Sequence, residues 1–285
     1  MKNPLPRLVR RGALILSAAL ALATLAFAAP HAVAQDWAKT ILDKSPRHQE
    51  WVKVKYGAGT PNARTIDAFV VYPEVSHKAP VVLLIHEIFG LTDWARSMAD
   101  DIAAMGYIVI APDLLSGDGP NGGGTSAFPD QQAAVKAVSG LDPGTVNADL
   151  NAAADYALHL PAANGKLAVI GFCWGGGKSF LFATQRKDLA AAFVFYGPPP
   201  PADALKNITA PVYGFYAGND ARISATVPDT KTAMAAAGKT YESVIYDGAG
   251  HGFMRAGEDP TNTNAANTTA RTAGLKRLET LLKSM

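Results

Sequence analysis

At residues 171–177 the chain has the sequence Gly171-Phe172-Cys173-Trp174-Gly175-Gly176-Gly177. Residues 167–170 before it are short and apolar like a buried strand, and residues 178–186 after it have helical composition. Cys173 therefore lies at a strand-to-helix turn of the form Gly-x-nucleophile-x-Gly, whose small flanking residues let a strained backbone expose one side chain at the top of a sheet. Cysteine occupies the position that usually holds serine in this pattern.

Strands and helices alternate on both sides of this turn. A hairpin is expected first, and the strands are predicted over residues 51–56, 66–72, 81–85, 107–110, 167–170, 191–196, 212–217 and 241–246. The helices are predicted over residues 92–105, 130–138, 145–160, 178–186, 226–237 and 266–283. This order predicts an α/β fold in which a mainly parallel central sheet is flanked by helices on both faces.

One long segment, residues 114–129, lacks helical or strand periodicity. It is polar and rich in glycine, and a structureless segment of this length inside a domain is usually functional or mobile. A solvated surface excursion is the alternative, and the sequence does not separate the two.

The beginning of the chain has the three parts of an export signal. Basic residues precede an apolar run over residues 13–29, and Ala32-Val33-Ala34 has the form of a cleavage site. We therefore expect removal of residues 1–34, a mature chain that begins at Gln35, and a periplasmic or secreted protein. A transmembrane anchor is the alternative, but the apolar run stops at Pro30 just before the processing site. General secretory and twin-arginine export both stay open.

Charge and length limit the functions of the mature chain. The leader contains four of the 26 Lys and Arg residues and none of the 24 Asp and Glu residues, which leaves 22 positive and 24 negative charges, a net charge of −2. No Lys/Arg cluster remains that could follow a phosphate backbone, which argues against nucleic-acid binding. Residues 35–285 suit a single α/β domain that acts on a small molecule as a monomer, without a stable membrane anchor.

Cys173 is the only cysteine of the chain, so it cannot form an internal disulfide. A buried inert thiol is the common state of a lone cysteine, whereas a turn that exposes its side chain favours a reactive thiol. A redox-sensing thiol is disfavoured because the chain has no second cysteine to resolve it.

Candidates for a base and an orienting acid follow Cys173 in the chain order nucleophile, acid, histidine. Asp220 comes just after the predicted strand 212–217, and His251 lies in a Gly-rich loop after strand 241–246. Taken alone, Asp220 would most often be a turn former and His251 a solvated side chain. Three such residues at three strand ends instead predict a Cys-His-Asp catalytic triad.

A second informative segment, His86-Glu87-Ile88-Phe89-Gly90, follows the buried strand 81–85. In this arrangement the loop after that strand supplies one amide of an oxyanion hole, and the residue after the nucleophile supplies the other. We assign these donors to the N–H groups of Ile88 and Trp174. Glu87 is either an ion-pair partner or a carboxylate that approaches Cys173.

These segments resemble the dienelactone hydrolases, a family with the α/β-hydrolase fold. The resemblance rests on residues 86–90, on residues 171–176, on the Asp220 loop and on Gly248-Ala249-Gly250-His251-Gly252-Phe253. The order of elements agrees over about residues 50–285.

The resemblance also implies roles for individual residues. The triad would consist of the cysteine, aspartate and histidine already named, and Glu87 would contact the resting thiol and help to produce the thiolate. Arg255, four residues after the histidine, would bind a substrate carboxylate, and Tyr196 would line the pocket. No metal or organic cofactor is implied.

One departure from the family concerns the substrate. Members that act on dienelactone have a second carboxylate-binding arginine in a region that corresponds to residues 97–165, where this chain has none. We therefore expect hydrolysis of a carboxylic ester or lactone through a thioester on Cys173, with a helix N-terminus that favours the thiolate. The alternative is a non-catalytic protein on the same fold that binds a small molecule or a partner.

Overall fold

The structure is a computed structural model that describes Met1 and residues 35–285. The predicted leader and its cleavage site lie outside the described residues. Across the described part of the chain, no helix combines the length and the apolar character needed to cross a bilayer.

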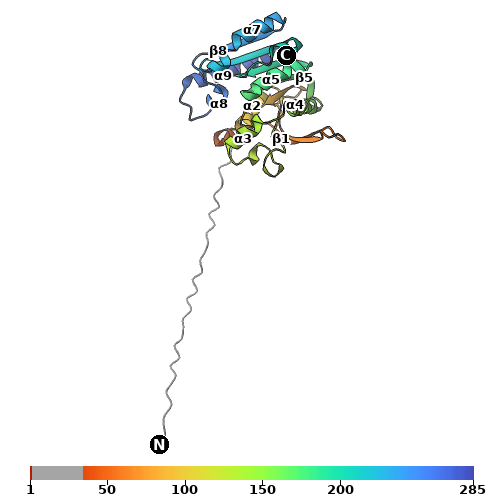
Figure 1. Cartoon of the computed structure of the whole chain (residues 1–285), viewed down its shortest axis with the longest axis vertical. Coiled ribbons are helices and arrows are strands. Elements are labelled where there is room, and N and C mark those ends of the chain that lie inside the picture. The colour runs from red at the N-terminus through yellow and green to blue at the C-terminus, as the bar shows by residue number, and fades with distance from the viewer. Residues whose placement is uncertain (2–34) are drawn as a thin grey trace.

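An eight-stranded sheet runs through the molecule in the order β1-β2-β4-β3-β5-β6-β7-β8 (Figure 1). β1 and β2 form the predicted antiparallel hairpin, β2 is antiparallel to β4, and the other neighbouring strands are parallel. The strands are β1 (Gln49–Tyr56), β2 (Arg64–Val71), β3 (Ala79–Ile85), β4 (Ile108–Pro112), β5 (Ala163–Phe172), β6 (Leu189–Phe195), β7 (Val212–Ala217) and β8 (Tyr241–Tyr246). The predicted fold class is confirmed.

Helices cover both faces of this sheet. The α-helices are α1 (Asp36–Asp43), α2 (Asp93–Ala104), α3 (Gln131–Ser139), α4 (Pro143–Leu158), α5 (Trp174–Gln185), α6 (Ala221–Ser224), α7 (Val227–Ala236), α8 (Phe253–Ala256) and α9 (Ala265–Leu282). α4, α5 and α7 pack into the core on one face, and α1, α2 and α9 pack into the core on the other. β8 and α7 lie at one end of the molecule, and β1 and α3 lie at the opposite end (Figure 1).

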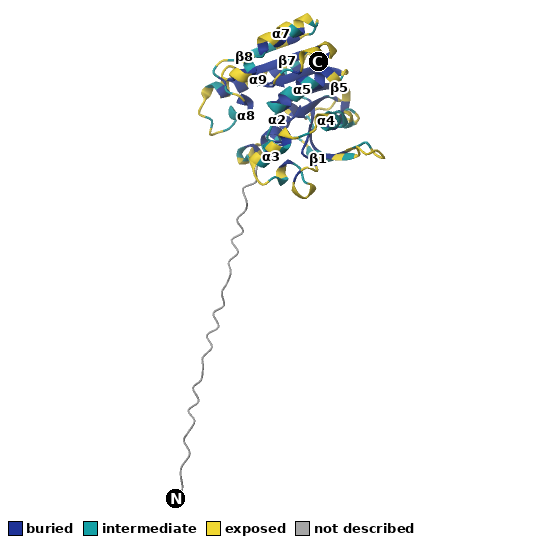
Figure 2. Ribbon diagram, in the orientation of Figure 1, coloured by how far each residue is buried: buried dark blue, intermediate teal, exposed yellow. Residues whose placement is uncertain are grey.

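The central strands are apolar throughout because both of their faces are buried. In β3, Val81, Leu83 and Ile85 belong to one core, whereas Val82 and Leu84 belong to the other. Figure 2 shows the same layering, with the central strands buried and the exposed residues on the outer sides of helices and in loops.

Several elements differ from the prediction. α5 begins at Trp174 rather than at residue 178, because tertiary packing holds the three glycines in a helix despite their low intrinsic propensity. α1 was not predicted, and it buries Ala38 and Leu42. The segment 114–129 contains two short 3₁₀ helices, Pro120–Gly122 and Thr125–Ala127.

The turn between β5 and α5 is held by a close approach of two main-chain segments. A Cβ atom on Gly171 would lie 1.9 Å from the carbonyl oxygen of Gly175, so no side chain fits there. Cys173 itself adopts φ 55° and ψ −116°, a strained conformation for a residue with a side chain. Its N–H donates to the carbonyl of Phe195 at 3.0 Å, which anchors the turn to β6.

This packing predicts a strong effect of Gly171→Ala on stability. We expect a loss of about 3 kcal/mol or more in the free energy of unfolding, because overpacked backbone cannot relax as a flexible side chain does. Gly140→Ala is the matched control, since its Cβ would meet neighbours only at ordinary contact distances of 3.5 and 3.6 Å. Urea unfolding followed by circular dichroism measures both variants, and equal stabilities would contradict the prediction.

Candidate active site

The structure brings together the three residues predicted as a triad. Cys173 lies at the start of α5, Asp220 directly precedes α6 after β7, and His251 lies in the loop after β8. The Nε2 atom of His251 is 3.0 Å from the Cys173 sulfur, and its Nδ1 atom is 2.5 Å from Oδ2 of Asp220. The three side chains thus form one continuous hydrogen-bonded chain at the carboxyl ends of parallel strands.

The hydrogen-bond partners of His251 define its tautomer. An ionised carboxylate only accepts hydrogen bonds, so Nδ1 carries the proton that is donated to Asp220. The lone pair of Nε2 is then directed at the thiol of Cys173, in the position of a general base. Asp220 is held in turn by the N–H of Ile223, which donates to its Oδ1 atom at 3.3 Å.

The resting thiol of Cys173 is protonated. Burial raises its pKa to about 11, and the negative charge of Glu87 raises the pKa as well. The N–H of Trp174 at the start of α5 favours the thiolate, as expected, but loss of solvation outweighs this effect in the resting site. A proton acceptor must take the thiol proton during any reaction of this sulfur.

Two main-chain amides face the sulfur, and they are the two assigned from the sequence. The N–H groups of Trp174 and Ile88 interact with the Cys173 sulfur and lower the pKa of its thiol. Trp174 is the first residue of α5, so its N–H has no acceptor within the helix. Both amides are available to an oxyanion formed next to the sulfur.

Glu87 lies 3% exposed beside the thiol, but its bonds go elsewhere. Its Oε2 atom pairs with Nε of Arg255 at 2.9 Å, and Tyr196 donates a long hydrogen bond of 3.4 Å to its Oε1 atom. The ion-pair alternative for Glu87 is thus the one that the structure shows, and its carboxylate acts on the thiol through its charge. Burial raises the pKa of the Glu87 carboxyl, and the Arg255 guanidinium opposes this rise.

A cavity of about 470 Å³ opens above these groups. Every predicted site residue except Asp220, which lies behind His251, lines this cavity. The sequence analysis missed one charged lining residue, Arg222, which lies two positions after Asp220 on α6. Its positive charge lowers the pKa of the Cys173 thiol.

Among residues 35–285 no cluster of three or more His, Cys, Asp or Glu side chains could hold a metal ion.

Comparison with known proteins places this site in a family. The profile of the dienelactone hydrolase family matches residues 66–284. A candidate carboxymethylenebutenolidase of Methylorubrum extorquens is 33% identical over 200 residues, which are 66% of this chain and 68% of that protein. The carboxymethylenebutenolidase of Pseudomonas putida is 29% identical over 182 residues, which are 62% of this chain and 76% of that protein.

Solved structures agree with the family match. A candidate dienelactone hydrolase of Klebsiella pneumoniae superimposes with a TM-score of 0.69 at 26% identity, and the alignment covers 84% of this chain and 100% of that one. The chain therefore belongs to the dienelactone hydrolase family and is a hydrolase with the α/β-hydrolase fold.

Proposed function

We propose that this protein hydrolyses carboxylic esters or lactones of small molecules through a thioester on Cys173. The observation that carries the proposal is the chain from the Cys173 sulfur through both ring nitrogens of His251 to the buried carboxylate of Asp220. Each side chain has the partner that its role in nucleophilic catalysis requires.

In the first half of the reaction, the carbonyl carbon of the substrate approaches the sulfur. Nε2 of His251 takes the thiol proton as the sulfur attacks, and the carbonyl oxygen becomes an oxyanion against the amides of Ile88 and Trp174. The bond between the carbonyl carbon and the alkoxy oxygen then breaks. His251 returns the proton to the departing oxygen, which leaves the acyl group on Cys173 as a thioester.

In the second half, water attacks the thioester. His251 accepts a proton from the water, and the same two amides bind the second oxyanion. The carbon–sulfur bond breaks, the carboxylic acid leaves, and the proton returns to Cys173 as its thiol. The protonated thiol of the resting site is thereby restored.

The charges of the cavity favour substrates that carry an anionic group. Arg255 is already paired with Glu87, whereas Arg222 has no ion pair within the described residues. An anion that binds Arg255 would compete with Glu87 for the guanidinium, and a Glu87 carboxylate released in a buried site would be a stronger base towards the thiol.

From the sequence we also propose where the protein acts and in which state. The mature chain, without the predicted leader, is a periplasmic or secreted protein, and it acts as a monomer.

Hydrolysis of an aryl acetate tests the proposed chemistry. We expect the purified mature protein to be active, and Cys173→Ala and His251→Ala each to lower kcat by roughly 10³-fold or more, as removal of a triad member does in other hydrolases. His159→Ala is the control, because this exposed histidine lies at the end of α4. Unchanged turnover in both triad variants would refute the assignment and favour a binding protein on the same fold.

The arginines of the cavity predict selectivity by charge. Arg222→Ala should lower kcat/KM for a carboxylated lactone by about tenfold, equivalent to roughly 1.4 kcal/mol. For a neutral aryl ester, kcat/KM should stay within about twofold of the native value. Lys231→Ala removes an equal charge from the exposed side of α7 and serves as the control. Equal losses on both substrates would contradict a role of Arg222 in binding the anion.

The raised pKa of the thiol predicts slow alkylation near neutral pH. Because Cys173 is the only cysteine, mass spectrometry of the Cys173 peptide after treatment with iodoacetamide follows the alkylation of this thiol. The alkylation rate should rise with pH through a midpoint near 11, above the value of about 8.5 for a free cysteine, since burial and Glu87 disfavour the thiolate. Glu87→Gln should move this midpoint to lower pH. A midpoint at or below that of free cysteine in the native protein would count against this electrostatic account.

A further inference from the structure

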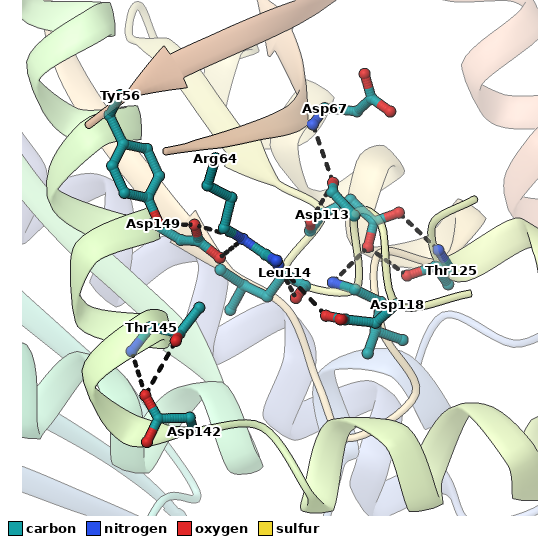
Figure 3. Close-up of polar contacts among 12 residues, drawn as sticks. Tyr56, Arg64, Asp67, Asp113, Leu114, Asp118, Thr125, Asp142, Thr145 and Asp149 are labelled. Carbon is teal, nitrogen blue, oxygen red and sulfur yellow. Dashed lines mark hydrogen bonds and ion pairs between the residues drawn. The ribbon is translucent and has the colours of Figure 1, made fainter. Parts of the chain in front are cut away.

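The segment 114–129, which the sequence left without a role, is joined by buried hydrogen bonds to Asp113, the residue between β4 and the segment. Asp113 and Thr125 are 5% and 2% exposed. The Thr125 N–H donates to Oδ2 of Asp113 at 2.7 Å, and the Thr125 hydroxyl donates to Oδ1 at 2.7 Å. Figure 3 shows the Asp113 carboxylate facing Thr125 with both contacts. Hydrogen bonds to a carboxylate are short and strong, so they orient the hydroxyl of Thr125.

The oriented hydroxyl holds the loop that follows β3. Because its hydrogen points at Asp113, the Oγ1 atom of Thr125 can accept, and it receives the N–H of Leu91 at 3.0 Å. The residue before Leu91 is Gly90, with φ 81°, and a Cβ atom there would lie 2.4 Å from Oγ1 of Thr125. Thr125 is therefore seated directly against the main chain of residues 90–91.

The same loop presents the amide of Ile88. The carbonyl of Glu87 accepts the N–H of Gly90 at 3.2 Å and lies 2.7 Å from Nδ1 of His86. In a planar trans peptide, the Glu87 carbonyl and the Ile88 N–H point in opposite directions. Bonds that hold the carbonyl on one side therefore turn the N–H of Ile88 towards the sulfur of Cys173.

The segment is itself anchored to the rest of the sheet. Arg64 at the start of β2 donates to the Leu114 carbonyl at 3.5 Å and to Oδ2 of Asp118 at 3.3 Å (Figure 3). Ser116 accepts the N–H of Asp67 at 2.9 Å. Leu115 packs in a small apolar cluster with Ile88 and Trp174, the two residues whose amides face the sulfur.

From these contacts we infer that Thr125, oriented by Asp113, is a positioning residue for the oxyanion-binding amide of Ile88. The inference rests on the proposed function, because it assigns Thr125 a part in stabilising the oxyanion of that reaction. A displaced Ile88 amide weakens binding of the oxyanion and leaves binding of the neutral carbonyl nearly as it was. Loss of the Thr125 hydroxyl should therefore lower kcat much more than it changes KM.

The test compares variants of Thr125 with a control in the same segment. Thr125→Val keeps the shape and removes the hydroxyl, and Thr125→Ser keeps the hydroxyl. Ser116→Ala removes an anchor whose hydrogen bonds go to the main chain of Asp67 and Asp113, with none to residues 90–91. With an aryl acetate, we expect Thr125→Val to lower kcat by roughly 10- to 100-fold, short of the 10²- to 10³-fold typical of a deleted oxyanion donor. KM should stay within about twofold, and Thr125→Ser and Ser116→Ala should stay within about threefold of the native kcat.

A second readout does not depend on turnover. Because the Ile88 N–H lowers the pKa of the Cys173 thiol, Thr125→Val should move the pH midpoint of iodoacetamide alkylation upward, and Ser116→Ala should not move it. This measurement separates two failures. If the native protein hydrolyses no ester, the proposed function fails, and the alkylation midpoints still decide whether Thr125 positions the amide.

Two results would overturn the inference. One is a Thr125→Val protein with native kcat and a native alkylation midpoint. The other is a loss of kcat in Ser116→Ala as large as that in Thr125→Val, which would show general loosening of the segment. If Thr125→Val does not accumulate as folded protein by circular dichroism, Thr125→Ala removes the hydroxyl together with the γ-methyl group and places no methyl group opposite Asp113, and its results decide in the same way.

Discussion

The strained main chain at Cys173 is the constraint on which the rest of the site depends. A side chain at φ 55° costs on the order of 1–3 kcal/mol, and the structure maintains it through the bond from the Cys173 N–H to Phe195 and the contact between Gly171 and Gly175. This conformation lifts the sulfur above the sheet, towards His251. It also leaves the first amide of α5 free, next to the sulfur. A relaxed turn would displace both the sulfur and the Trp174 amide that faces it.

Electrostatics around the sulfur keep it neutral until a reaction begins. Burial and the charge of Glu87 raise the pKa of the thiol, and the amides of Trp174 and Ile88 with the charge of Arg222 are too weak to reverse this. The groups that would stabilise a charge are nevertheless in place. In the proposed reaction, the sulfur becomes negative only as His251 removes its proton, and the oxyanion forms where the two amides already point.

The positions of the candidate site residues could be predicted from the sequence wherever a few neighbouring residues determine the strand or turn that carries them. β7 and β8 have the predicted bounds, and Asp220 and His251 lie after them, where the fold places side chains on loops at the carboxyl ends of strands. The start of α5 was missed because its glycines disfavour a helix in isolation, whereas close packing against neighbouring segments, including the ends of β3 and β6, holds them there. Arg222 belongs to no recognisable motif, and only its position two residues after Asp220 could have indicated that it lies near the site.

The sequence by itself determined the eight strands, the helices α2–α5, α7 and α9, the turn at Cys173 and the residues of the candidate triad, because each depends on a few neighbouring residues. Only the tertiary structure decided that Glu87 pairs with Arg255, 168 positions away, rather than with the thiol. It also decided that the thiol is protonated at rest and that Thr125 bears on the loop carrying Ile88. Such outcomes depend on which groups meet in a buried site, where loss of solvation outweighs the local effect of a helix end.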